Sequence, residues 1–343
     1  MPVLLSDTID EYLVARRSGG YKASTIRNDA LTLRELLAML GNIQVRSVTE
    51  RHIDNFMAAG AARGLSPSTM NLRLAALRGF FTHCTHRRYV PSGQDPTAHR
   101  RKYRDMKRSR LRVPVLNFAR MLDAAGDPRD RVVIALGLYL LLRESEIRLL
   151  RLGDVDLTTG TIAVVVPKSS KTDAMPICVE LDRELRRWLT FYSEHADRSL
   201  RPTDALVPSW RCGRPEPLPS GIYRVASSDV FEPSRHYSTP HRSVQAALIA
   251  CGYATHDENG KSLQEGVHTL RRSAARARFD ALAGMGVDKA LRHVQATLHH
   301  AHVSTTEHYI GLDADMEDRD NMLRGEIMFP VAEKASALRK VGT

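Results

Sequence analysis

Residues 132–146 read VVIALGLYLLLRESE, and this stretch organises the second half of the chain. Its apolar run from Val132 to Leu142 is too short to cross a bilayer, which takes roughly 20 residues. The run instead predicts a buried helix over about Asp130 to Leu142, ended by Arg143. The guanidinium of Arg143 is expected to leave the core at a cleft or to pair with Glu146.

Outward from this helix, the pattern predicts further helices and one pair of strands. Thr161–Val166 is a β-branched run and Met175–Val179 a second apolar one, and the polar PKSSKTDA between them predicts a hairpin turn. Residues 201–265 are rich in Pro, Ser and Gly and predict no clear element. The expected helices cover about Leu116–Ala125, Arg183–His195, Thr269–Leu282, Lys289–Leu298 and a segment around Thr305.

The first hundred residues predict a small helical domain. Ser24, Thr49 and Ser66 are expected to cap three of its helices, and Gly41 ends the first of these. Residues at helical spacing form the buried face of the last helix: Met70, Leu74, Leu77 and Phe81. Its opposite face carries Asn71, Arg73 and Arg78, which are either candidates for phosphate contact or part of a solvated helix face.

Residues 99–112 read HRRKYRDMKRSRLR, far more basic than the chain average. Such a block resists packing into a core and is typical of an interdomain linker. We expect a helical domain over residues 1–98, this linker over 99–113 and a larger domain over 114–343. A basic linker is suited to a phosphate backbone, and its candidate DNA contacts are Arg100, Arg101, Lys102, Lys107 and Arg108.

The composition is that of a globular protein with a basic surplus. Lysine and arginine number 50 against 39 acids, a formal net charge of +11, and hydrophobic residues make up 43%. This balance excludes a disordered chain and favours a polyanionic partner, nucleic acid first. The N-terminus, MPVLLSDTIDEYLV, has no basic leader pattern, and the four cysteines are far apart. We therefore expect reduced thiols and a cytoplasmic, nucleoid-associated protein without membrane contact.

The second domain carries several residues suited to chemistry on phosphate. Lys168 lies in the hairpin turn, His268 and Arg271 share one helix face, and Tyr309 follows His300 by nine positions. Each has a structural alternative, such as a turn lysine or a core aromatic. The group of His299, His300, His302 and His308 also suggests a metal site. No cysteine or carboxylate completes a zinc-like ligand set, so we predict no metal and no other cofactor.

Together with Arg143, these side chains supply every part of a metal-free phosphodiester exchange. Two arginines offer planar forks to the non-bridging oxygens as charge develops on the phosphate. A tyrosine hydroxyl attacks phosphorus to form a covalent ester, with help from neighbouring cations or a base. A lysine or histidine then protonates the departing oxygen.

The second domain resembles the catalytic domain of the tyrosine recombinase (phage integrase) family. The resemblance covers about residues 115–313, and residues 1–98 resemble the family's SAM-like core-binding domain more loosely. The motifs that carry it match in order and approximate spacing: Leu142-Arg143-Glu144-Ser145-Glu146, Lys168, His268-Thr269-Leu270-Arg271, Leu298-His299-His300 and Ser304-Thr305-Thr306-Glu307-His308-Tyr309.

The resemblance implies a role for each matching residue. Tyr309 would be the nucleophile, leaving a 3′-phosphotyrosyl link and a free 5′-hydroxyl, while Arg143 and Arg271 hold the scissile phosphate. Lys168 would be the general acid; it is preferred to Lys171 because the family uses the first lysine of this turn, eight residues before Pro176.

The resemblance also assigns the remaining polar residues and exposes two departures. His268 would act as base or phosphate ligand, His300 would hydrogen-bond the phosphate, and Glu146 matches a structural carboxylate. The family usually has glycine where this chain has Leu141 and His299. Neither departure removes a catalytic group, but both bear on the local backbone geometry.

The implied fold is mainly α with a small β-sheet, an α+β protein of two domains that form a C-shaped clamp around duplex DNA. The implied function is site-specific recombination as a tetramer across two DNA sites, with a possible accessory directionality factor and without metal or ATP. The family's arm-binding domain finds no room before Ser6. The apolar cluster of residues 327–331 docks either on a neighbouring subunit or on its own.

Two alternatives use the same fold. A catalytically silent DNA-binding regulator would have lost activity, against which the complete set of catalytic groups argues. A type IB topoisomerase shares the chemistry but relaxes DNA without joining partner sites. Fold resemblance does not separate them.

Overall fold

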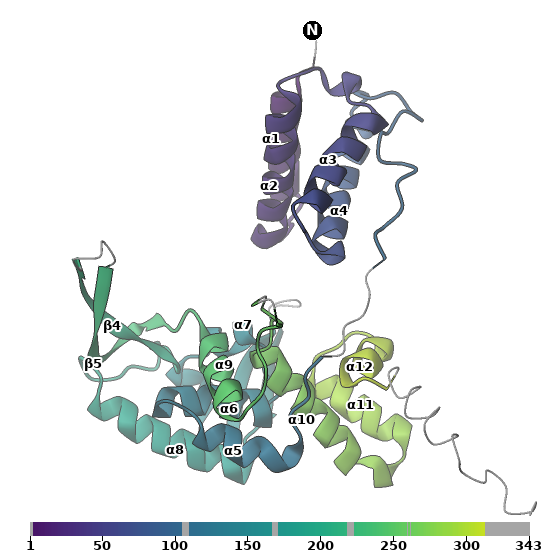
Figure 1. The fold of residues 1–343 in the computed structure, drawn as a ribbon. Helices are drawn as coiled ribbons and strands as arrows, with labels where there is room; N and C mark the ends of the chain where they lie inside the picture. Colours follow the sequence, from purple (N-terminus) through teal and green to yellow (C-terminus); the bar gives the residue numbers. More distant parts are fainter. Residues whose placement is uncertain are drawn as a thin grey trace, which may run out of the picture. The chain divides into compact units, whose positions relative to one another are not determined.

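The computed structural model describes residues 3–104, 110–166, 171–217, 223–258, 260 and 262–312, with the backbone alone at 171, 212–217, 223–229 and 283. The chain divides into two compact units, Met1–Ser109 and Arg110–Thr343, and each has its own hydrophobic core. Helices dominate both units (Figure 1), which confirms the predicted fold class of mainly α with small sheets. The expected clamp arrangement of the two units stays a prediction.

The first unit is a group of helices around an apolar core. The buried stripe predicted for its last helix is confirmed, since Met70, Leu74, Leu77 and Phe81 are each at most 1% exposed. They pack with Leu33 and Leu36 of the second helix. The elements are α1 (Leu5–Ser18), α2 (Ala23–Leu40), η1 (Val45–Ser47), α3 (Glu50–Ala62) and α4 (Pro67–His86).

Three of the four predicted helix boundaries of this unit are confirmed. Thr49 accepts a hydrogen bond from the His52 backbone at the start of α3, and Ser66 accepts one from Thr69 at the start of α4. Gly41 ends α2 with a φ of 73°. The prediction for Ser24 was wrong: Lys22 is the N-cap, because the backbone is extended there and is already helical at Ser24.

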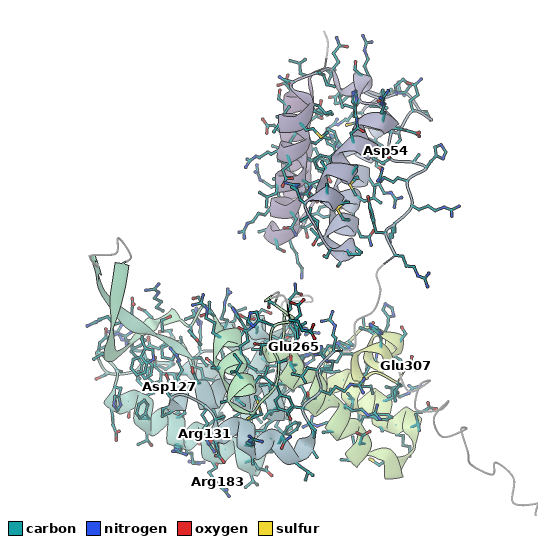
Figure 2. All side chains as sticks on the ribbon, viewed as in Figure 1. Asp54, Asp127, Arg131, Arg183, Glu265 and Glu307 are labelled. Atoms are coloured by element: carbon teal, nitrogen blue, oxygen red, sulfur yellow. The ribbon has the colours of Figure 1, made fainter. Side chains whose placement is uncertain are left out.

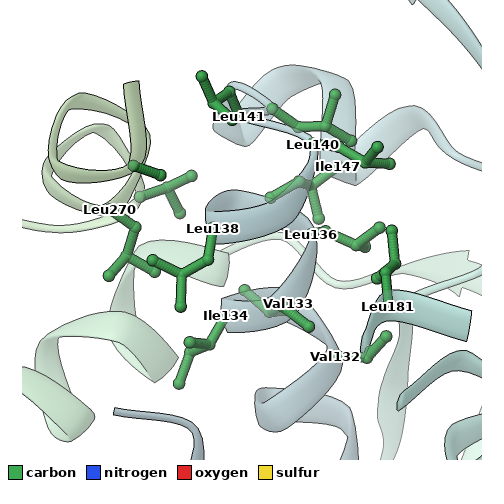
Figure 3. Packing of buried hydrophobic residues seen from close by; sticks show 14 of the residues in the cluster. Val132, Val133, Ile134, Leu136, Leu138, Leu140, Leu141, Ile147, Leu181 and Leu270 are labelled. Carbon is green, nitrogen blue, oxygen red and sulfur yellow. The ribbon is translucent and has the colours of Figure 1, made fainter. Parts of the chain in front are cut away.

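The second unit is built on α6 (Pro128–Tyr139), the buried helix predicted over about residues 130–142. The predicted end was wrong: the helix stops at Tyr139, because Leu141 adopts a left-handed φ of 55°, and Arg143 is instead the N-cap of the next helix. Figure 3 shows its side chains packed against Ile147, Leu181 and Leu270 from three surrounding helices. Those helices are α7 (Glu144–Leu149), α8 (Val179–Glu194) and α10 (Val267–Ala281). The described part of the chain contains no helix long and apolar enough to cross a membrane.

The predicted hairpin exists, with one boundary in error. β1 (Val155–Asp156), β2 (Thr161–Val166) and β3 (Lys171–Pro176) form an antiparallel sheet in that order. β3 starts four residues before the predicted Met175, because Lys171 already pairs with Val166. Val179, expected in the strand, instead begins α8.

Residues 201–265, for which the sequence predicted no element, contain a ribbon and a helix. β4 (Pro208–Pro217) and β5 (Tyr223–His236) pair with register shifts, and α9 (Pro240–Ala250) follows. Figure 1 shows the ribbon projecting from the helices of this unit. Prolines and bulges interrupt the period-2 pattern by which strands are usually predicted.

Short elements complete the second unit and bring its C-terminal motifs to α10. The pairs α10–α11, α11–α12 and α10–α12 are all in contact. The remaining elements are η2 (Val115–Asn117), α5 (Phe118–Asp123), η3 (Leu152–Asp154), η4 (Ala283–Met285), α11 (Val287–Thr297) and α12 (Val303–Ile310).

Candidate active site

Arg143 stands at the start of α7, directly after the buried helix α6. Its backbone N–H donates to Oε2 of Glu146 at 2.7 Å, and its Nη1 donates to Oε1 of the same carboxylate at 2.6 Å. This confirms the pairing expected from the sequence. Glu146 thus fixes both the first turn of α7 and the guanidinium of Arg143, which keeps 17% side-chain exposure.

Arg271, on α10, reaches the same carboxylate from the other side. Its Nη1 lies 3.3 Å from Oε2 of Glu146 and also donates to the carbonyl of Leu141. Its Nη2 donates to the carbonyl of Leu298 at 2.6 Å, and Nη2 of Arg143 donates to that same carbonyl at 3.1 Å. The two predicted phosphate-binding arginines therefore converge on one carboxylate and one backbone oxygen.

The carbonyls of Leu141 and Leu298, which bind the arginines, are oriented by residues in the left-handed backbone conformation. Leu141 has a φ of 55° and His299, directly after Leu298, has a φ of 51°. These are the positions where the resembled family usually has glycine, which adopts positive φ without a steric penalty. The chain retains that backbone shape with larger side chains, which costs about 1 kcal/mol at each position.

The charges at this centre favour binding of an anion. Glu146 is fully buried (0% side-chain exposure) and Arg271 is 1% exposed, so one carboxylate balances two guanidinium groups. Burial lowers the pKa of Arg271 to about 10, which leaves it charged at neutral pH. Each guanidinium has five N–H donors, and the bonds above occupy only part of them. The centre therefore retains a net positive charge with donors for phosphate oxygens.

Tyr309, on α12, is half-buried beside this centre. Its hydroxyl donates to the carbonyl of His268 at 3.4 Å, and its ring meets the edge of His300 with centroids 5.3 Å apart. Burial raises the pKa of Tyr309, while the positive charges of Arg271, Arg272 and Arg143 oppose that rise. The phenol is thus neutral at physiological pH and has to release its proton when it reacts.

His268 and His300 flank the phenol on different elements. His268 keeps an exposed edge, but partial burial and then the charge of Arg271 lower its pKa, so its imidazole is neutral at pH 7 and can accept a proton. Nδ1 of His300 lies 3.1 Å from the hydroxyl of Thr306 on α12. The ring of His300 and the backbone carbonyl of His268 thus lie next to Tyr309, and the roles assigned to the two imidazoles stay predictions.

A second buried arginine was missed by the sequence analysis. Arg272 donates to Glu265 at 3.1 Å and to the carbonyl of Leu111 at 3.0 Å (Glu265 is labelled in Figure 2). These bonds tie the first residues of the second unit to α10, the helix that carries His268 and Arg271. The double arginine in HTLRR was the available signal, but nothing in the sequence indicated the pairing with Glu265.

Lys168, the predicted general acid, lies outside the described residues, as do Lys107, Arg108 and the cluster 327–331. The strands β2 and β3 that flank residues 167–170 are described, and β3 contacts the site through Asp173, whose carboxylate lies 2.8 Å from His299. Among the described residues there is no group of three or more His, Cys, Asp or Glu able to hold a metal ion.

Of the basic residues predicted to contact DNA in the first unit, some are bonded to other protein groups and others are exposed. Arg73 is paired with Glu35 at 2.6 Å. Arg78 donates to the carbonyl of Arg100, which itself pairs with Asp54 of α3 (Figure 2). The remaining candidates of the described basic segment, Arg101 and Lys102, are exposed.

The start of the basic segment is held by α4. Asn71 exchanges two hydrogen bonds with the backbone of Tyr103, at 2.9 and 2.8 Å, and the hydroxyl of Tyr103 accepts from Arg100 at 2.9 Å. The first residues of the predicted flexible linker are therefore ordered against the first unit. For Asn71 the sequence left open a phosphate contact or a solvated helix face; in the structure its amide binds the chain itself.

Comparison with known proteins places these motifs in one family. Residues 115–316 match the phage integrase family, and residues 8–90 match the phage integrase N-terminal SAM-like domain. The tyrosine recombinase XerC of Actinobacillus pleuropneumoniae serotype 7 is 23% identical over 308 residues, covering 88% of this chain and 87% of that protein. XerC of Chromohalobacter salexigens is 27% identical over 295 residues, covering 84% of each.

Solved structures share the fold at low sequence identity. A lambda integrase dimer bound to a COC′ core site superposes with a TM-score of 0.64 and 16% identity, covering 90% of this chain and 77% of that one. The Tn1549 transposon integrase in complex with transposon right end DNA superposes with a TM-score of 0.59 and 15% sequence identity. This match covers 91% of this chain and 99% of that one. With the family match extending over more than half its length, the chain belongs to the phage integrase family of tyrosine recombinases.

Proposed function

We propose that this protein is a site-specific DNA recombinase that cleaves and rejoins duplex DNA through a covalent phosphotyrosine. The observation that carries the proposal is the convergence of Arg143 and Arg271 on Glu146 and on the carbonyl of Leu298, beside the half-buried hydroxyl of Tyr309. A scissile phosphate at these guanidinium groups would present its phosphorus to the phenol.

The proposed cleavage exchanges one ester for another. The Tyr309 oxygen attacks phosphorus and forms a P–O bond, the bond to the 5′-oxygen breaks, and its electron pair stays on that oxygen. The phenol proton passes to a base, for which neutral His268 is suited. The 5′-oxygen takes a proton from the general acid, which we assign to Lys168. Nothing is oxidised or reduced.

The guanidinium groups stabilise the pentacoordinate state. As negative charge builds on the non-bridging oxygens, Arg143 and Arg271 offer donors that are already in place, so little reorganisation is needed at the moment of reaction. His300 is proposed to donate to the same phosphate. The phosphotyrosyl ester keeps the bond energy, so a 5′-hydroxyl from a second strand can reverse the step without ATP.

The partners follow from this chemistry. Strand exchange needs two DNA sites and four cleavages, so we propose assembly as a tetramer on duplex DNA near the nucleoid. The net charge of +11 supports binding to a polyanion. A lambda integrase tetramer bound to a Holliday junction has the same fold, with a TM-score of 0.61.

The direct test is trapping of the covalent intermediate. Nicked duplexes tiled across the DNA that flanks the gene are incubated with the protein and resolved on a denaturing gel. The wild type is expected to yield a protein–DNA adduct, whereas Tyr309→Phe yields none while still binding DNA. An adduct that persists in Tyr309→Phe, or its absence from the wild type on every duplex, rejects the proposal.

The two alternative functions give different results in the same system. A silent regulator would bind the duplexes and form no adduct. A type IB topoisomerase would relax supercoiled plasmid that carries no site, whereas the recombinase is expected to join a pair of sites identified by adduct formation. The products of paired-site plasmids therefore separate the enzyme classes.

A further inference from the structure

The strongest unassigned contact links the hairpin to the arginine site. Nε2 of His299 lies 2.8 Å from Oδ2 of Asp173 on β3, although the residues are 126 positions apart. The backbone of His299 is in the left-handed conformation, with a φ of 51°. The residue before it is Leu298, whose carbonyl accepts hydrogen bonds from both arginines, and the residue after it is His300. One residue thus connects two parts of the proposed machinery, its side chain meeting β3 and its backbone forming the turn after Leu298.

The contact matters because β3 is an edge strand. In the order β1–β2–β3, β2 sits in the middle and buries Ile162, Val164 and Val166, whereas β3 buries Met175 near its far end. Near its start, the backbone ladder with β2 and the contact of Asp173 hold the strand. Edge strands without packed side chains are the least restrained part of a sheet.

His299 is well placed to restrain that strand. Its side chain is 14% exposed, and its Nδ1 is buried with no hydrogen-bond partner among the described residues. Among the described residues, the bond through Nε2 is therefore the hydrogen bond that holds the ring, with Asp173 as acceptor. Glycine, usual here in the resembled family, has no side chain to make it.

We propose that His299 and Asp173 form a positioning pair, which holds the start of β3 against the turn of Leu298 and His300 and thereby places the proton donor for the leaving 5′-oxygen. The inference rests on the proposed function and adds to it a role for two residues that contact neither phosphate nor nucleophile. Residues 167–170 themselves lie outside the described chain; the pair acts on the strand that follows them.

The role predicts a defect confined to protonation of the leaving group. In a duplex whose bridging 5′-oxygen is replaced by sulfur, the P–S bond breaks and its electron pair leaves on a thiolate. Alkyl thiols ionise near pH 8.5, roughly, far below alcohols, so this leaving group needs no proton donor. A misplaced donor then slows cleavage of the oxygen duplex and leaves the sulfur duplex unaffected.

The experiment compares adduct formation on the two duplexes in single turnover with the full-length protein. His299→Gly and Asp173→Ala are expected to slow the oxygen duplex about 10-fold, part of the roughly 100- to 10,000-fold that a positioned acid contributes. On the sulfur duplex both variants are expected to match the wild type. Asp173→Asn keeps an acceptor oxygen and is expected to restore most of the rate.

Matched controls separate this role from simple structural damage. Asp182→Ala removes an exposed carboxylate paired with Arg186 on α8 and is expected to change neither rate. Arg143→Ala is expected to be slow on both duplexes, because phosphate stabilisation does not depend on the leaving group. Thermal melts verify that each variant is folded.

Each outcome decides the proposal. Variants slow on both duplexes show damage to the whole site and overturn the pair's specific role, as do variants that match the wild type on both. A wild type that forms no adduct on either duplex rejects the proposed function instead, so the two failures are distinguishable.

Discussion

Glu146 links the two arginines at the centre of the site, Arg143 and Arg271. Its two oxygens bind the backbone and side chain of Arg143 and the side chain of Arg271, and it has no exposed surface. Removing one member of a buried ion pair leaves the remaining charge unbalanced, and that penalty exceeds the value of the pair itself. The carboxylate is thus a structural requirement for holding two cations close together before phosphate binds.

Glu146→Gln is therefore expected to destabilise the second unit strongly. Loss of the negative charge leaves Arg143 and Arg271 facing each other, at a cost of about 3 kcal/mol, which corresponds to roughly 6–12 °C in Tm for a unit of this size. Calorimetry or circular dichroism melts measure it. The control, Asp182→Asn in the exposed pair with Arg186, should cost under about 1 kcal/mol; equal losses would contradict the argument.

The pKa of His268 predicts how the stability and activity of the protein change at acid pH. Partial burial and the charges of Arg271 and Arg143 hold its pKa below the ordinary 6.5, so it stays neutral until the pH falls below that lowered value. The unfolded chain takes up the proton first, so this group's contribution to stability decreases as the pH falls below 6.5. The same protonation removes the proposed base.

Adduct formation by the wild type is expected to hold at pH 6.5 and to decline at lower pH, as His268 protonates. Subsaturating DNA makes the profile report the free enzyme. His268→Gln should lower the plateau by about 100-fold or more and abolish the acid limb that belongs to this residue. An unchanged acid limb in the variant would assign it to another group.

At the scale of elements, the end of α12 fixes the nucleophile. Gly311, two residues after Tyr309, ends the helix in a left-handed conformation with a φ of 77°. A Cβ at this glycine would collide with the guanidinium of Arg112, which comes from the start of the second unit. The glycine therefore leaves room for the guanidinium of Arg112 at the end of α12, two residues after Tyr309.

Gly311→Ala is expected to displace the guanidinium of Arg112 from the end of α12 and to slow adduct formation about 10-fold, since a displacement of about 1 Å near the nucleophile is enough to cost more than that. Gly252→Ala is the matched control: its φ is 85°, so the backbone strain is equivalent, but a Cβ there meets nothing within 4 Å. It should lose about 1 kcal/mol of stability and no cleavage rate. Equal kinetic effects would exclude the steric explanation.

The elements that could be predicted are those with strong local signals. α6 was predicted from its continuous apolar run, and α3 and α4 from Thr49 and Ser66 at their N-termini. β4 and β5 were not predicted, because prolines and register shifts at bulges interrupt the alternating pattern of both strands. The early start of β3 was missed because Lys171, Thr172 and Asp173 are polar residues at the edge of the sheet, where no apolar alternation marks a strand.

At the scale of the whole molecule, we expect the positive charge and the exposed residues at the start of the basic segment to contribute most to DNA binding. Arg101 and Lys102 are exposed, whereas Arg73 is engaged with Glu35. A residue that neutralises a phosphate releases a counterion, and removing it lowers the slope of log affinity against log salt by about 1. Arginines already paired within the protein contribute less to this slope.

Fluorescence anisotropy with a labelled duplex between 50 and 200 mM salt, roughly the range in which such binding weakens most, tests this distribution. Arg101→Gln and Lys102→Gln are each expected to lower the slope by about 1. Arg73→Gln, the matched control, should reduce stability and leave the slope unchanged. A reduced slope for Arg73→Gln would mean that Arg73 leaves Glu35 to contact DNA.

The sequence by itself determined the residue types and spacing of the site: Arg143, His268 with Arg271, His300 and Tyr309. It also predicted the helices that carry His268, Arg271 and Tyr309. Periodicity and motif spacing are local properties, so the sequence displays them directly. Only the tertiary structure decided what holds the arginines. The carbonyl of Leu298 reaches Arg143 across 155 positions, and Asp173 meets His299 across 126. The direction of a backbone carbonyl and the approach of an edge strand depend on how distant elements pack, which local pattern does not record.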